Sequence, residues 1–140
     1  MTRSLAVWFV MLVGASVNGA LREAVLIPQL GDTAGRAMST LMLCSLVLLL
    51  TWSTIRWISP RSTREAWLIG GFWVALTLVF EFIAGHYLFG QPWNELTQDY
   101  DVLQGRIWVL ALVTIAVAPR LCASARGVIE TRKKRLPVVL

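Results

Sequence analysis

Four long apolar runs dominate this 140-residue sequence. Each run covers about 20 residues, which is the length that an α-helix needs to cross a hydrocarbon core of about 30 Å. Short polar stretches with proline or glycine separate the runs. Strands are much shorter than such runs, so the pattern predicts helices. We therefore expect an all-α, polytopic membrane protein whose four transmembrane helices form one bundle, at about residues 5–27, 36–57, 65–89 and 102–122.

The composition favours the same class of protein. Hydrophobic residues make up 56% of the chain and charged residues 15%, whereas a soluble domain averages about 45–50% apolar and about 25% charged residues. A chain of this size has too much surface to cover with so few charges. We expect a single transmembrane domain over residues 1–140, in which residues 123–140 form a basic cytoplasmic tail, and no soluble domain.

The distribution of charge predicts the orientation of the four spans. Four spans place both termini on the same side of the membrane. Most of the basic residues are expected on that side, namely Arg3, Arg56, Arg61, Arg64, Arg120, Arg126 and the run at 131–135. The other side receives Asp32, Arg36, Glu95, Asp99 and Asp101. Because lysine and arginine are enriched in cytoplasmic loops, both termini are expected in the cytoplasm. The net charge of +5 then indicates contact with the headgroups of the lipid bilayer, not with nucleic acid.

Local signals predict where the helices begin and end. The proline and glycine at 28–31 are expected to end the first helix near residue 27. Asp32 or Thr33 is expected to cap the second helix, which would begin near residue 36. Ser62 and Glu65 have the spacing of a capping box directly before the third apolar run.

Ionisable residues inside the runs predict a polar cluster in the outer half of the bundle. Gly14, Asn18 and Arg22 recur every fourth position and so form one helix face, which suits contact with other helices. With a rise of 1.5 Å per residue, Arg22 and Glu81 lie at similar depths, about 24–25 Å from the cytoplasmic ends of their helices. The predicted cluster contains Asn18, Arg22, Glu23, Glu81, His86 and Arg106, beneath an outer acidic loop with Glu95, Asp99 and Asp101.

Two interpretations of this cluster remain open. In the first, Glu81 forms a structural ion pair with Arg22 or Arg106, and either arginine fits. In the second, Glu81 is a proton or cation site, because burial and a nearby arginine shift the pKa of a carboxyl group in opposite directions. The sequence shows no catalytic motif, no cofactor motif and no metal-ligand spacing, and Cys44 and Cys122 lack CxxC spacing. We therefore expect a protein that is not an enzyme and that holds no metal or cofactor.

Several short motifs resemble those of small four-helix inner-membrane proteins of bacteria that carry no assigned activity. They are Asn18-Gly19-x-Leu21-Arg22-Glu23, Glu81-Phe82-x-x-Gly85-His86-Tyr87, Trp93, Asp99-Tyr100-Asp101 and Gly105-Arg106-x-Trp108. The resemblance implies a place in the bacterial inner membrane and implies no activity. Small multidrug transporters differ because their membrane-embedded glutamate lies in the first helix, and fluoride channels differ because their Phe-Ser-Thr-Phe type motif is missing here.

Two functions are therefore considered. The first is the binding or permeation of a proton or small solute at the outer polar cluster, with a homo-oligomer as one possible form. The second is an accessory or assembly role, in which the chain packs on a larger membrane complex and the cluster is purely structural.

Overall fold

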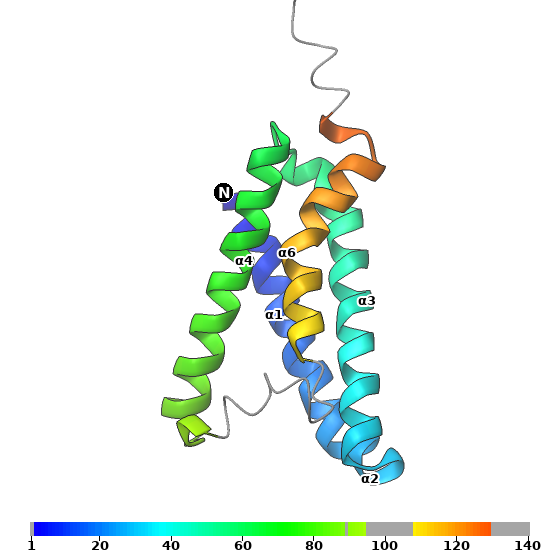
Figure 1. Cartoon of the computed structure of the whole chain (residues 1–140), viewed down its shortest axis with the longest axis vertical. Helices are drawn as coiled ribbons and strands as arrows, with labels where there is room; N and C mark the ends of the chain where they lie inside the picture. Colours follow the sequence, from blue (N-terminus) through cyan, green and yellow to red (C-terminus); the bar gives the residue numbers. More distant parts are fainter. Residues whose placement is uncertain (1, 89, 95–107, 130–140) are drawn as a thin grey trace, which may run out of the picture.

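The computed structural model describes residues 2–88, 90–94 and 108–129, and in these residues the regular structure is entirely helical. Four long helices run alternately up and down (Figure 1). They are α1 (Thr2–Leu21) continued by η1 (Arg22–Leu26) and α2 (Ile27–Leu30), α3 (Asp32–Ile58), α4 (Thr63–Ile83) continued by η2 (Ala84–Leu88), and α6 (Trp108–Ala125).

The two ends of this bundle differ in what they contain. One end, called here the terminal end, holds Thr2, the α3–α4 loop at 59–62 and residues 125–129 (Figure 1). The opposite end, called the far end, holds η1, α2 and η2. This alternation confirms the predicted arrangement of four helices for the described residues.

Three of the helices are long and apolar enough to cross a membrane, and they cover Thr2–Leu30, Asp32–Ile58 and Thr63–Leu88. The fourth is a shorter apolar helix over Val109–Ala125 in the described part. Its predicted beginning at residue 102 lies outside the described residues, as does most of the predicted tail.

The first helix does not end near residue 27 as the sequence suggested, but continues to Leu30. A proline inside an α-helix lacks an N–H donor, and its ring collides with the carbonyl group four residues earlier. Here the π-helical turn η1 precedes Pro28, and the Ile27 N–H donates to the Arg22 carbonyl oxygen five residues back. This wider turn accommodates the proline, and Gly31 ends the helix with a φ of 89°.

The beginning of α3 also differs from the prediction. Asp32 is the first helical residue and not the cap, because Gly31 occupies the N-cap position without a side-chain cap bond. The Asp32 carboxylate instead accepts a hydrogen bond from Arg36 Nε at 3.0 Å. Since one residue separates α2 from α3, the two helices pack closely, and a Cβ atom on Gly35 would lie 2.9 Å from Ile27 Cα.

The predicted cap of α4 by Ser62 is confirmed, and the return bond of Glu65 reaches the residue before the cap and not the cap itself. Ser62 Oγ accepts a hydrogen bond from the Glu65 N–H at 3.2 Å, and Glu65 Oε2 accepts one from the Arg61 N–H at 2.6 Å. These bonds satisfy amide groups that have no partner inside the helix. The helix begins at Thr63, two residues before the predicted position.

Two arginines hold the C-terminal part of α3 at the terminal end. Arg3 Nη1 donates to the Trp57 carbonyl oxygen at 2.8 Å, and Arg126 Nη1 donates to the Trp52 carbonyl oxygen at 2.6 Å. Each guanidinium group also lies over the ring of the tryptophan that it contacts. A cation is favourable at the negative end of a helix dipole, so these contacts tie α1 and α6 to α3.

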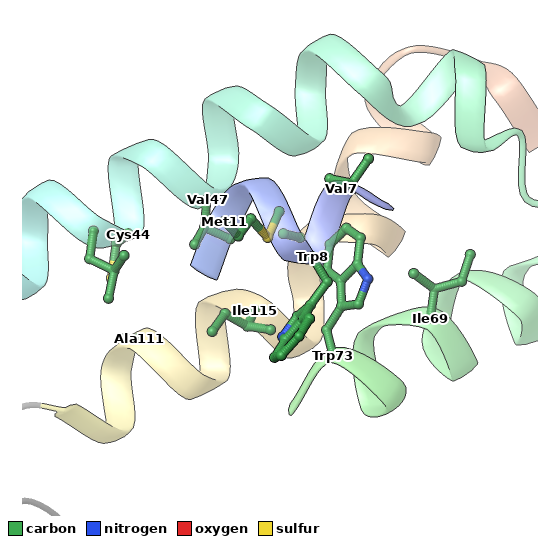
Figure 2. Close-up of a cluster of buried hydrophobic side chains, with 11 residues drawn as sticks. Val7, Trp8, Met11, Cys44, Val47, Ile69, Trp73, Ala111 and Ile115 are labelled. Atoms are coloured by element: carbon green, nitrogen blue, oxygen red, sulfur yellow. The ribbon is translucent and has the colours of Figure 1, made fainter. Parts of the chain in front are cut away.

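The main apolar core lies between all four helices, and its centre is a pair of buried tryptophans (Figure 2). Trp73 Nε1 donates to the Ser4 carbonyl oxygen at 2.9 Å, and Trp8 Nε1 donates to Thr77 Oγ1 at 3.1 Å. Both bonds join α1 to α4, so each indole is buried with its polar atom satisfied. The other labelled core residues are Val7, Met11, Cys44, Val47, Ile69, Ala111 and Ile115.

Helices α4 and α6 approach each other closely at Gly70. A Cβ atom at this position would overlap with the main-chain carbonyl group of Ala116. Small residues allow the backbones of membrane helices to come this close. The neighbouring Gly71 is exposed and has open space around it, so only the first glycine of the pair makes a close helix contact.

Candidate functional site

Both π-helical turns of the described residues lie at the far end of the bundle (Figure 1). Turn η1 contains Arg22 and Glu23, and turn η2 contains His86. A π-helical turn is rare and appears frequently at functional sites. The far end therefore combines unusual backbone geometry with three of the six residues of the predicted polar cluster.

The stripe of small and polar residues on α1 packs against α3, as the sequence predicted. Gly14 faces the side chain of Leu46, and Asn18 Nδ2 donates to the Ser39 carbonyl oxygen at 3.0 Å and to Ser39 Oγ at 2.9 Å. Among the described residues, the buried Oδ1 atom of Asn18 has no hydrogen-bond partner. Asn18 therefore belongs to the α1–α3 contact and does not reach α4 through any of these bonds.

Arg22 forms its ion pair with its sequence neighbour. Arg22 Nε lies 3.2 Å from Glu23 Oε1, and the two side chains are 30% and 60% exposed. The pair is a local contact on η1, so the structure does not bring Arg22 to Glu81. An ion pair with this much exposure adds little stability.

Glu81 lies half-buried near the end of α4. Towards the far end, α4 diverges from α1 (Figure 1). Arg22 begins η1, which continues α1, whereas Glu81 lies near the end of α4. Residues at equal depth in two helices meet only where the helices stay adjacent, and α1 and α4 do not stay adjacent at this end. Arg106 lies outside the described residues, so its pairing with Glu81 stays a prediction.

His86 lies in a group of aromatic side chains that the sequence pattern did not predict. Its ring stacks on Trp93, with centroids 4.1 Å apart and planes 17° apart, and it meets Tyr87 edge-on at 4.9 Å. Trp93 also stacks with Phe82 at 6.2 Å. We call these four residues, Phe82, His86, Tyr87 and Trp93, the aromatic group.

The chain returns along α4 to build this group. Gly90 has a φ of 65°, a left-handed conformation that glycine adopts readily, and it allows the chain to reverse direction after η2. Pro92 then directly precedes the helical residues Trp93 and Asn94. The glycine and proline between two aromatic segments were the available sequence signal, because a tight reversal there brings Trp93 back to His86.

The hydrogen bond of His86 determines which ring nitrogen carries a hydrogen. Nδ1 lies 2.9 Å from the Gln91 carbonyl oxygen. A carbonyl oxygen only accepts, so Nδ1 carries the hydrogen when this bond forms, and Nε2 is then either a lone-pair acceptor or, in the protonated ring, a second donor. His86 can therefore offer an acceptor atom beside the faces of Trp93 and Tyr87.

In the described part of the chain, no group of three or more histidine, cysteine, aspartate or glutamate side chains is placed to hold a metal ion. The predicted acidic loop residues Glu95, Asp99 and Asp101 lie outside the described residues. Cys44 and Cys122 are free and buried.

No protein-family model, curated protein or solved structure matches this chain. A function is therefore inferred from the contacts of its own residues. In the described residues, the far end contains an ion pair, stacked aromatic rings and both π-helical turns.

Proposed function

We propose that this chain is a small integral membrane protein that binds a small cation at its far end. One observation carries the proposal: His86 is held by Gln91 and stacked on Trp93, in a π-helical turn that follows the half-buried Glu81. A carboxylate, an imidazole acceptor and exposed aromatic faces are the groups that attract a cation. The π-turn supports the proposal, since π-helical turns appear frequently at functional sites.

The distribution of charge favours an orientation with the far end outside the cytoplasm. In the described residues the terminal end carries Arg3, Arg56, Arg61, Arg64 and Arg126. The three spans of sufficient length and the rule that places basic residues in the cytoplasm support termini on that side. By resemblance, we place the protein in the inner membrane of a bacterium, with the cation site facing the periplasm.

The packed core favours binding over permeation through a single chain. Trp73 is fully buried and Trp8 is nearly so, and with Ile115 and Met11 they fill the space between the four helices (Figure 2). In the described residues this core is mainly apolar, and its two indole N–H groups are already bonded. A cation that crossed the middle of the bundle would therefore lose its hydration with little compensation. Permeation would therefore require a path along an interface between chains.

Binding is testable because the chain contains one histidine, which gives one set of imidazole signals in an NMR spectrum. We expect tetramethylammonium to shift the His86 and Trp93 signals to saturation when the protein is held in lipid nanodiscs. Glu81→Gln is expected to weaken this binding about tenfold, the effect of losing about 1.4 kcal/mol of charge attraction. Trp93→Leu is expected to weaken it further by removing the aromatic face.

Two controls make this result specific. Glu65→Gln lies at the terminal end, and glutamine keeps the capping box, so binding should be unchanged. The neutral isostere tert-butanol should cause no saturable shift. Equal responses to both compounds, or the absence of saturation in a folded protein, would contradict cation binding.

A second function is favoured by the outward face of α4. Gly71 and Ala75 are exposed one helical turn apart, and nothing lies within 4 Å of a Cβ atom placed on Gly71. This spacing of small residues is typical of a face that packs on another membrane helix. An accessory subunit would leave its membrane in mild detergent as part of a defined larger complex, and native mass spectrometry would detect the added mass.

A further inference from the structure

An apolar groove of about 410 Å³ opens between α3 and α6 near the terminal end of the bundle. The two helices lie side by side (Figure 1), and the groove is lined by Leu48, Leu49, Trp52, Leu121, Cys122 and Ala125. Its volume is within the range of about 300–1,000 Å³ that is common for sites of small ligands. Because it opens sideways on the surface of a membrane-spanning bundle, its natural contents are hydrocarbon.

A guanidinium group lies at one end of this groove. Arg126 follows the lining residue Ala125, and its Nη1 donates to the Trp52 carbonyl oxygen at 2.6 Å. The guanidinium carbon lies 5.2 Å from the centroid of a Trp52 ring. Of the five N–H donors of an arginine, one is used in this bond, so the group is held in position with donors left for an anion.

A second cation lies on the same side of α3. Arg56 follows Leu49 by seven residues and Trp52 by four, which places it on the same helix face, about 10 Å from Leu49 along the axis at 1.5 Å per residue. Arg56 is exposed, and in the described part of the chain it has no hydrogen bond or ion pair. The aliphatic side chains that line the groove and the two arginines at its end therefore lie within about two helical turns of each other.

We propose that this groove binds one anionic phospholipid. An acyl chain lies along Leu48, Leu49 and Leu121, and the phosphate and the anionic headgroup meet Arg56 and Arg126. Charge complementarity selects the lipid, because a zwitterionic headgroup brings a positive charge next to two guanidinium groups, whereas an anionic headgroup does not. Trp52 lies at the level expected for the membrane interface, where indole rings concentrate.

The proposal is tested by native mass spectrometry of the detergent-purified full chain. Phosphatidylglycerol and phosphatidylcholine with identical acyl chains are added in equal amounts, and the bound fraction of each is measured. The unaltered protein is expected to retain phosphatidylglycerol several-fold more than phosphatidylcholine. Arg56→Gln, which breaks no described contact, is expected to reduce this preference at least threefold.

Two further variants separate a specific site from general charge attraction. Arg64→Gln removes an exposed arginine at the same end, on α4 and away from the groove, so the preference should remain. Leu49→Trp narrows the groove and should reduce retention of both lipids. Equal binding of the two lipids by the unaltered protein, an equal loss in Arg64→Gln, or full retention in Leu49→Trp would each overturn the proposal.

Discussion

Gly70→Ala is expected to lower the free energy of unfolding of the bundle by about 1–3 kcal/mol, the usual effect of overpacking. The added methyl group would overlap with the carbonyl group of Ala116. That obstacle is main chain within α6, so it cannot rotate away as a side chain would. The overlap is removed only if α4 and α6 move apart, and this movement reduces the packing contacts between the two helices.

Gly71→Ala is the matched control because it makes the same chemical change one residue away. Nothing lies within 4 Å of the position of the new Cβ atom, and alanine favours a helix more than glycine does. We expect no loss of stability, or a small gain. The midpoints of unfolding in mixed detergent micelles, followed by circular dichroism, check both variants, and equal midpoints would show that the α4–α6 contact is less close than described.

Trp73→Ala is expected to destabilise the bundle by about 3 kcal/mol, in the range for large core truncations. Trp73 is fully buried at the centre of the core, and its indole bonds the Ser4 carbonyl oxygen across the α1–α4 contact. In lipid the transfer from water contributes little, but the cavity and the lost contacts remain. Trp73→Phe keeps most of the volume and loses the hydrogen bond, so a smaller loss of about 1 kcal/mol is expected.

Trp67→Ala controls for the loss of any tryptophan from α4. Trp67 is 48% exposed and lies outside the core clusters of the described residues, so its removal should change the unfolding midpoint by much less. Thermal unfolding of the purified variants in detergent measures the difference. A loss of stability in Trp67→Ala as large as that in Trp73→Ala would contradict the position of Trp73 at the centre of the packing.

The features predicted from the sequence are those that depend on local pattern. Apolar runs of spanning length predicted helices, and the Ser62–Glu65 spacing predicted a cap that the structure contains. The spacing of four residues between Gly14 and Asn18 predicted a helix face that packs on another helix, and α3 packs on this face. The helices and the cap depend on residues within one or two helical turns, so spacing alone predicts them. For Gly14 and Asn18 the spacing predicted the packed face but not the helix that packs on it.

The features that were missed depend on how whole helices are wound and placed. Pro28 suggested a helix end, but the π-turn before it removes the steric conflict and the helix continues. The match in depth between Arg22 and Glu81 did not bring them together, because α4 diverges from α1. The stack of His86 on Trp93 depends on a chain reversal whose exact path no helical periodicity encodes.

The most direct test of the central claim measures which end of the bundle faces which side of the membrane. In a variant whose two native cysteines are replaced by alanine, a single cysteine is placed at Gln91 on the far end or at Thr63 on the terminal end, both exposed positions. A membrane-impermeant maleimide added to intact spheroplasts should label the cysteine at position 91 and should label the one at position 63 only after lysis. Labelling of both positions in intact spheroplasts, or the reverse order, would contradict a membrane-spanning bundle with its cation site on the outer side.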